Sequence, residues 1–227
     1  MASASMAVLD SPGRVRSPLT IDVCGVTLTG DLFAPLPPDG LVIFALGSSG
    51  GRYDAHNVLA ARRFNDAGLG TVLLDLLTPA EDLARTPAPD IALLANRLAA
   101  ATRWLRRQHW AASTPIGWYG VGAAAGAALW AAAEPDADVA AIVAVDSQVA
   151  LAADRLRAVR APTLLMAGVA NTEVLDANRV TQRRLGCPVL LDIIGSIRPL
   201  ADAGDGHLAA GEALRWLSHR LSSPGRP

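Results

Sequence analysis

The sequence predicts an α/β protein with a doubly wound, mainly parallel sheet of about eight strands flanked by helices. Short apolar runs alternate with longer segments in which apolar residues recur at helical spacing. Several runs, such as 41–46 and 163–167, contain no charged residue, as expected of strands buried on both faces. The connections between runs and helical segments are short, which favours parallel strands joined by helices.

Composition narrows the class of protein. A chain of 227 residues with 51% hydrophobic residues suits a single domain with a large core. The formal net charge of -1 argues against a nucleic-acid partner. All 20 basic residues are arginine, which excludes Schiff-base chemistry on lysine and disfavours a P-loop.

We expect one domain, residues 18–221, between a flexible arm at 1–17 and a loose tail at 222–227. No secretory signal pattern and no bilayer-spanning apolar run is present, so we expect a cytoplasmic protein without a membrane partner. Cys24 and Cys187 are interpreted as core thiols rather than as a disulfide.

Each element follows from local residue patterns. A hairpin is expected around Gly25, between β-prone runs at 19–23 and 26–33. Asp54 is expected to cap a helix that Gly68 closes. Further strands are expected at 41–46, 71–75, 116–121, 139–145, 163–167 and 189–194, and further helices at 90–108, 123–133, 152–159, 173–185 and 208–221, with a proline-rich loop between 75 and 90.

The stretch 115–129 passes from a β-prone segment through a glycine turn into an alanine-rich helix. This arrangement is typical of a nucleophile elbow, in which G-x-S-x-G places a serine on a strained strand-to-helix turn. Here Gly122 occupies the centre, where it accepts a positive φ without a Cβ penalty. A plain glycine-rich turn is the alternative, and the rest of the chain decides between them.

Several stretches together resemble the α/β-hydrolase superfamily, and within it the dienelactone-hydrolase-like group. The stretches that carry the resemblance are 44–48, 73–79, 117–129 and 160–165, with 178–179 and Trp216 in register. The resemblance covers nearly the whole chain and implies the α/β-hydrolase fold. No cap domain is expected, because the connection after Asp146 is too short to hold one.

The sequence departs from this family at every position of the catalytic triad. Gly122 stands at the serine position, Asn171 at the acid position and Arg198 at the histidine position. The oxyanion loop opens with Leu46-Gly47 instead of a His-Gly pair. Glycine offers no nucleophile, and arginine stays protonated and cannot act as a base. The resemblance therefore implies a chain that no longer runs this mechanism.

Other polar residues are weighed as substitutes. Asp75 and Asp146 end strands and are the best stray carboxylates, with hydrogen bonds to loops or helix ends as the alternative. Loop serines at strand ends could act as nucleophiles, whereas the histidines are interpreted as mostly structural and no metal-ligand spacing is recognised. The residues considered are Ser48, Ser49, Ser147, His56, His109, His207, His219, Asp202 and Asp205.

Shape and polarity are expected to persist without the triad. Backbone N–H groups at Ala123 and in the loop after Leu46 should still converge at the start of the elbow helix. Arg198 adds a fixed positive charge to the same shallow, open pocket. The predicted ligand-binding residues are Leu46, Gly47, Ser48, Gly122, Ala123 and Arg198, the predicted ligand is a small anion, and no cofactor or metal is expected.

The leading interpretation is a non-catalytic protein of this fold that binds a small molecule or a partner. Two alternatives stay open. One is an active enzyme, an esterase or a non-hydrolytic lyase or cyclase, that uses other residues. The other is a structural subunit of an oligomer, since an exposed helix or edge strand could pair with a second copy.

Overall fold

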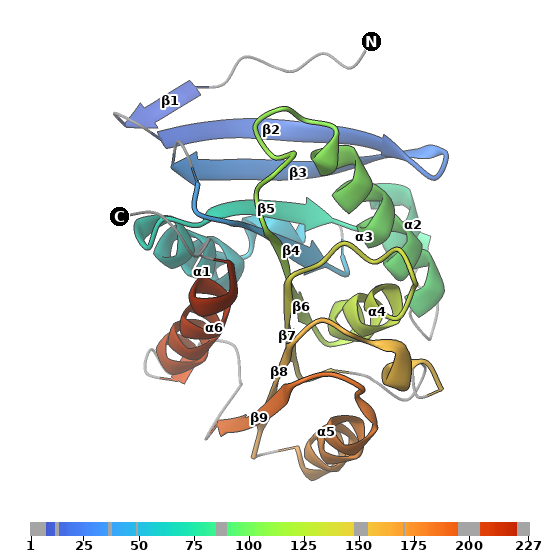
Figure 1. The fold of residues 1–227 in the computed structure, drawn as a ribbon. Helices are drawn as coiled ribbons and strands as arrows, with labels where there is room; N and C mark the ends of the chain where they lie inside the picture. Colours follow the sequence, from blue (N-terminus) through green and yellow to red (C-terminus); the bar gives the residue numbers. More distant parts are fainter. Residues whose placement is uncertain are drawn as a thin grey trace.

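A single sheet with helices on both faces forms the centre of the molecule (Figure 1). The computed structural model describes residues 8–11, 14–35, 38–48, 50–84, 90–147, 154–169, 171–194 and 205–221. The strands are β1 (Val8–Ser11), β2 (Arg14–Val23), β3 (Val26–Pro35), β4 (Leu41–Leu46), β5 (Gly70–Asp75), β6 (Ile116–Val121), β7 (Ala141–Val145), β8 (Thr163–Gly168) and β9 (Val189–Ile194).

The strand order across the sheet is β1-β2-β3-β5-β4-β6-β7-β8-β9. Strands β4 to β9 run parallel to one another, whereas the pairs β1–β2, β2–β3 and β3–β5 are antiparallel. The doubly wound, mainly parallel sheet is therefore confirmed. In the described part of the chain it has nine strands, because the short strand β1 extends one edge.

The central strands are buried on both faces, as their apolar runs predicted. Every residue of β4, β5, β7 and β8 is buried. Such strands need helices on both sides of the sheet, because parallel strands must cover both apolar faces. Their carboxyl ends meet at one edge of the sheet, where ligands of doubly wound folds bind.

The strands begin nearer the N-terminus than the sequence predicted. Residues 1–17 were expected to be flexible, but Val8–Ser11 is a strand and β2 begins at Arg14. The hairpin with β3 runs in unbroken register from Val23↔Val26 to Arg14↔Pro35, so pairing extends beyond the apolar run. The single domain and its expected bounds stay predictions.

The helices are α1 (Ala55–Asp66), α2 (Pro79–Ala84), α3 (Ile91–Arg106), α4 (Ala123–Ala132), α5 (Thr172–Arg184) and α6 (Asp205–Leu221). Short 3-10 turns occur at η1 (Gly51–Tyr53) and η3 (Leu156–Ala158). Helix α2 lies where only a proline-rich loop was expected, and η3 replaces the expected helix at 152–159, of which 152–153 lie outside the described residues.

The helices form two layers (Figure 1). Helices α1 and α6 cover one face, where Phe64 and Leu217 are fully buried in a cluster with Phe44 of β4. Helices α3 and α4 cover the other face, where Leu98 and Ala128 join a cluster with strand residues. Helix α4 is almost entirely buried, which explains why its sequence is alanine-rich.

Side-chain caps fix where α1 and α3 begin. The Asp54 carboxylate accepts a hydrogen bond from the backbone N–H of His56 at 2.9 Å and starts α1. Asp90 does the same for α3 through the N–H of Leu93 at 2.9 Å. The predicted cap at Asp54 and the predicted start of α3 at Asp90 are thereby confirmed.

Candidate functional site

The turn between β6 and α4 has the backbone of a nucleophile elbow. Gly122 lies at its apex with φ 59° and ψ -119°, a backbone conformation that residues other than glycine rarely adopt. Its N–H donates a hydrogen bond to the Val145 carbonyl at 2.8 Å, which ties the turn to the neighbouring strand β7. The predicted positive φ is therefore confirmed.

The small residues around the apex are required by close packing. A Cβ on Gly120 would lie 2.8 Å from the carbonyl oxygen of Ala124 and from the N–H nitrogen of Ala125. Helix α4 thus packs directly against β6, the strand that precedes it in the chain. The sequence argument for small flanking residues holds at this position.

The apex itself is open. A Cβ added to Gly122 would meet no atom within 4 Å, so the space above the elbow is not filled by another described side chain. The first N–H groups of α4, at residues 123–125, have no side-chain cap. The first N–H groups of a helix have no partner within the helix, and they carry its positive dipole end.

The loop after β4 lies beside the elbow. Leu46 is buried, whereas Gly47 and Ser48 are exposed. A Cβ on Gly47 would lie 3.8 Å from the backbone nitrogen of Ala124, so this loop packs against the start of α4. The structure thus places the Gly47 loop beside the start of α4, and the ligand-binding role of Gly47, Gly122 and Ala123 stays a prediction. Ser49 lies outside the described residues.

The Asp75 side chain holds the loop after β4 in place through hydrogen bonds. Its carboxylate is 1% exposed and accepts hydrogen bonds from the N–H of Gly50 at 2.8 Å and of Arg52 at 3.1 Å. The Arg52 guanidinium also pairs with Asp75, and with Asp31 at 3.3 Å. Asp75 therefore holds a loop, which is the structural alternative that its position at a strand end left open.

Asn171 also has a structural task. It is exposed, and its side-chain oxygen accepts the N–H of Val174 at 3.2 Å as the cap of α5. The residue at the acid position thus starts a helix. Arg198, at the histidine position, lies outside the described residues, as do Asp202 and the side chains of Asp205 and His207.

Asp146 lies at the carboxyl end of β7 in an uncommon conformation. Its φ is 45°, and Cys24 in the β2–β3 turn is the other non-glycine residue with positive φ among those described. One carboxylate oxygen of Asp146 accepts the N–H of Gly168 at 3.2 Å. Burial raises the pKa of this carboxyl group above its ordinary value, and the hydrogen bond from Gly168 opposes that shift.

The neighbouring serine is not a nucleophile candidate in this structure. Ser147 is 1% exposed, and its hydroxyl donates a hydrogen bond of 2.7 Å to the Asn178 side-chain oxygen. Asn178 in turn donates to the Val174 carbonyl at 2.8 Å, so this buried network joins β7 to α5. Ser48, in contrast, is exposed at the end of β4.

The remaining candidates lie apart from the elbow. His56 sits in the first turn of α1, His109 follows α3 and His219 lies in the last turn of α6. Among the described residues, no group of His, Cys, Asp and Glu side chains is placed to hold a metal ion. Both cysteines are free, as expected. Cys187 is half-buried and packs against the core, whereas Cys24 is exposed and is not the core thiol expected.

Two arginines with structural roles were not identified from the sequence, the half-buried Arg52 and the buried Arg97. Arg52 holds the loop after β4. Arg97 on α3 is 2% exposed and forms a bidentate ion pair with Glu81 of α2, with N–O distances of 2.7 and 2.6 Å. This pair lowers the pKa of Glu81 to about 2. A signal was present, because Arg97 falls within the apolar stripe of α3 formed by Leu94 and Leu98.

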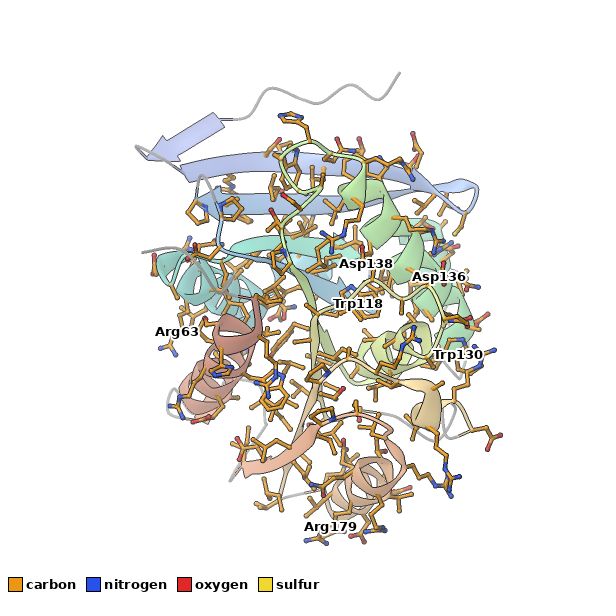
Figure 2. All side chains as sticks on the ribbon, in the orientation of Figure 1. Arg63, Trp118, Trp130, Asp136, Asp138 and Arg179 are labelled. Atoms are coloured by element: carbon orange, nitrogen blue, oxygen red, sulfur yellow. The ribbon has the colours of Figure 1, made fainter. Side chains whose placement is uncertain are left out.

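A cavity lies away from the elbow. A cavity of about 260 Å³ opens between α3, α4 and the loop after α4. Trp118 lies between the sheet and these helices, with Asp136 and Asp138 at the rim (Figure 2). The Trp118 indole N–H donates to the Thr102 hydroxyl at 3.1 Å, and Arg106 pairs with Asp138. No predicted site residue lines this cavity.

In the part of the chain that is described, no helix is both long and apolar enough to cross a membrane.

Comparisons with known proteins fit this geometry. No protein-family model matches the chain. Dienelactone hydrolase from Anabaena variabilis superimposes with a TM-score of 0.86 at 34% identity, over 92% of this chain and 99% of that one. A curated relative from two strains of Mycobacterium tuberculosis, named "Putative phosphoribosyl transferase", is 38% identical over 99% of this chain and 51% of that protein. The chain thus spans about half the length of these curated relatives.

More distant structures share the fold alone. Est1E from Butyrivibrio proteoclasticus has a TM-score of 0.74 at 13% identity, over 91% of this chain and 99% of that one. A cold-adapted esterase from an Arctic intertidal metagenomic library has a TM-score of 0.75 at 16% identity, over 97% of this chain and 100% of that one. Sheet order, elbow and these similarities together define an α/β-hydrolase fold. The chain belongs to the dienelactone-hydrolase-like group of the α/β-hydrolase superfamily.

Proposed function

We propose that this chain is a dienelactone-hydrolase-fold protein that has lost the Ser-Asp-His triad and binds a small anion without hydrolysing an ester. The observation that carries the proposal is Gly122 at the apex of an intact elbow. The backbone that presents a nucleophile is retained, but the residue at its centre has no side chain. Asn171 supports the same proposal, because the side chain at the acid position caps α5.

The elbow presents backbone N–H donors to an anion, as a hydrolase presents them to its oxyanion. The uncapped N–H groups at the start of α4 point toward the strand ends, and the loop at Gly47 packs against them. The open space above Gly122 gives room for a carboxylate or phosphate oxygen. We propose that Arg198 completes this site, since a guanidinium pairs with two oxygens of such a group and stays charged.

Thermal unfolding in the presence of small anions tests this binding. Butanoate and inorganic phosphate should raise the melting temperature of the parent chain, because a ligand of the native state stabilises it. The increase should disappear in Arg198→Ala. An Arg198→Ala variant that responds to both anions like the parent would show that Arg198 takes no part in the site.

Kinetics test the absence of hydrolysis. Loss of a triad nucleophile or base typically reduces turnover by about six orders of magnitude. The purified chain should therefore not hydrolyse p-nitrophenyl acetate faster than buffer does. Gly122→Ser should stay inactive too, because a serine without a base is not activated. Turnover by the parent would favour an enzyme that uses other residues, and a lack of both anion binding and turnover would favour a structural subunit.

The curated relatives suggest which anion to test first. Their printed name is that of a phosphoribosyl transferase, and this chain corresponds to about half of their length. We propose a phosphorylated ribose as the natural ligand, because its phosphate groups are the dianions that helix N-termini and arginine bind well. Phosphoribosyl diphosphate should raise the melting temperature at lower concentration than phosphate does. Equal responses to the two would reject this choice of ligand.

A further inference from the structure

Asp146 lies at the same edge of the sheet as the elbow. Val145 pairs with Val121 of β6 and with Met166 of β8, so Asp146 follows directly at the carboxyl edge between these strands. Gly122 is bonded to the residue preceding Asp146, and the carboxylate reaches Gly168 on the other side. Because neighbouring strands lie about 4.8 Å apart, the backbone of Asp146 is one strand spacing from the elbow.

The bonding of Asp146 is incomplete compared with that of other acids in the protein. Asp75 is buried and pairs with Arg52, and Glu81 pairs with Arg97. Asp146 is half-buried, yet among the described residues no arginine or histidine forms an ion pair with it. Its one hydrogen bond, from Gly168, occupies a single oxygen.

A half-buried carboxylate without a cation is costly to the folded state, because burial removes water without supplying a partner. Burial accordingly raises the pKa of Asp146. Such groups concentrate at functional sites, where a ligand completes their bonding. Asp146 also lies at the sheet edge where ligands of this fold class bind.

We propose that Asp146 determines the specificity of the site by accepting a hydrogen bond from a hydroxyl or ammonium group of the ligand. The inference rests on the proposed binding of an anion at the elbow and adds a second requirement. The ligand would carry an anionic group at the elbow and a hydrogen-bond donor a few atoms away. Short hydroxy acids and amino acids combine the two features, whereas simple carboxylates lack the donor.

Four probes with the same carbon chain length separate these contributions. Butanoate carries only the anion, 4-hydroxybutanoate and 4-aminobutanoate add a donor, and butylammonium carries only the donor. Their apparent affinities are measured by thermal shift for the parent and for Asp146→Gly, which accepts the positive φ without strain. Asp146→Asn is measured as a second variant, and Asp136→Asn removes an exposed charge from the loop between α4 and β7 as a matched control.

We expect one or both of the donor-bearing acids to bind the parent about fivefold or more tightly than butanoate. Which of them does so identifies the donor as hydroxyl or ammonium. In Asp146→Gly this preference should disappear, while butanoate binds no more weakly than to the parent because a like charge has been removed. The preference should persist in Asp136→Asn, which keeps the Asp146 carboxylate.

The outcomes distinguish this inference from the proposed function. Binding of butanoate by the parent without any gain from a donor would overturn the role of Asp146 and leave the anion site intact. Binding of butylammonium alone, lost in Asp146→Gly, would support Asp146 as a ligand-contacting residue and reject the anion site. A donor preference that survives in Asp146→Gly would overturn the inference, and failure of all four probes would reject both proposals.

Discussion

At the residue scale, Gly122 and Asp146 share an uncommon backbone conformation at one edge of the sheet. Both have positive φ, and both directly follow a parallel strand. Gly122 adopts this conformation without strain because it has no Cβ. Asp146 does so with a side chain, which is uncommon outside turns and functional sites.

Substitution of Gly122 tests the elbow backbone directly. Gly122→Ala should lower the free energy of unfolding by about 1 kcal/mol or more, because a Cβ disfavours this φ. Among the described residues, no atom lies within 4 Å of the new methyl group, so the loss would come from the backbone. Gly211→Ala in α6 is the matched control, since that position is also open but has no positive φ.

Urea denaturation of both variants gives the comparison. Gly211→Ala should raise the free energy of unfolding by up to about 1 kcal/mol, since alanine favours a helix. A Gly122→Ala variant that is as stable as the parent would contradict the elbow conformation.

The raised pKa of Asp146 predicts a pH-dependent change in stability. A carboxyl group whose pKa is higher in the folded state binds its proton more tightly there, so it stabilises the fold less as pH rises. Asp146→Asn should therefore raise the free energy of unfolding at pH 7, and the gain should shrink as the solution is acidified through the pKa of Asp146. A gain that grows on acidification would show that the shift has the opposite sign.

At the element scale, a buried arginine and a half-buried one hold short segments whose positions the apolar pattern does not determine. Arg97 holds α2, a helix with no buried residue, through Glu81. Arg52 holds the loop after β4 through Asp75. Both segments lie at the carboxyl edge of the sheet, so these ion pairs shape the surroundings of the elbow.

The Glu81–Arg97 pair should dominate the stability of α2. Glu81→Gln would leave Arg97 buried with a weaker partner and should destabilise the protein by about 1 to 3 kcal/mol at pH 7. The pKa of Glu81 is lowered to about 2, so its contribution is present above the ordinary pKa near 4.5 and is lost as pH falls toward 2. The loss in Glu81→Gln should accordingly shrink on acidification.

Arg97→Met provides the control for this pair. Combined with Glu81→Gln, it should recover part of the lost stability, because no buried charge is left without its partner. A double variant whose loss equals the sum of the two single losses would show that the side chains are not coupled.

The Asp75 carboxylate should control the order of the loop after β4. In Asp75→Asn, hydrogen exchange should accelerate at the Gly50 and Arg52 amides, which donate to this carboxylate in the parent. The Leu76 amide, which donates to the Leu46 carbonyl at 2.8 Å, serves as the internal control and should keep its protection. Equal acceleration at all three amides would indicate general destabilisation instead.

At the scale of the whole molecule, the sequence was sufficient for the fold because apolar periodicity and glycine turns act locally. The buried run at 41–46 and the turn at Gly122 needed no tertiary information. Ion pairs between distant segments, such as Arg52 with Asp75, could not be predicted in this way, because an arginine in a loop usually faces solvent. Helix α2 could not be predicted for a related reason, because Arg97, which pairs with its Glu81, lies on a different helix, α3.

The site was predicted in part. The positive φ at Gly122 was predicted correctly, and the loop at Gly47 packs against the start of α4, but the ligand-binding role of these residues stays a prediction. The partner and ligand expectations, the cytoplasmic location and the role of Arg198 stay predictions. Asp146 was recognised only as a carboxylate at a strand end, since neither its φ nor its lack of a cationic partner can be inferred from residue order.

Intact-mass spectrometry after incubation with a fluorophosphonate tests the central claim most directly. Such a reagent forms a stable adduct with an activated serine of a triad, and the elbow of this chain carries glycine at that position. The predicted result is an unchanged mass of the native protein after hours at excess reagent. One equivalent of adduct, mapped to Ser48 or to any other serine, would contradict the loss of hydrolase chemistry.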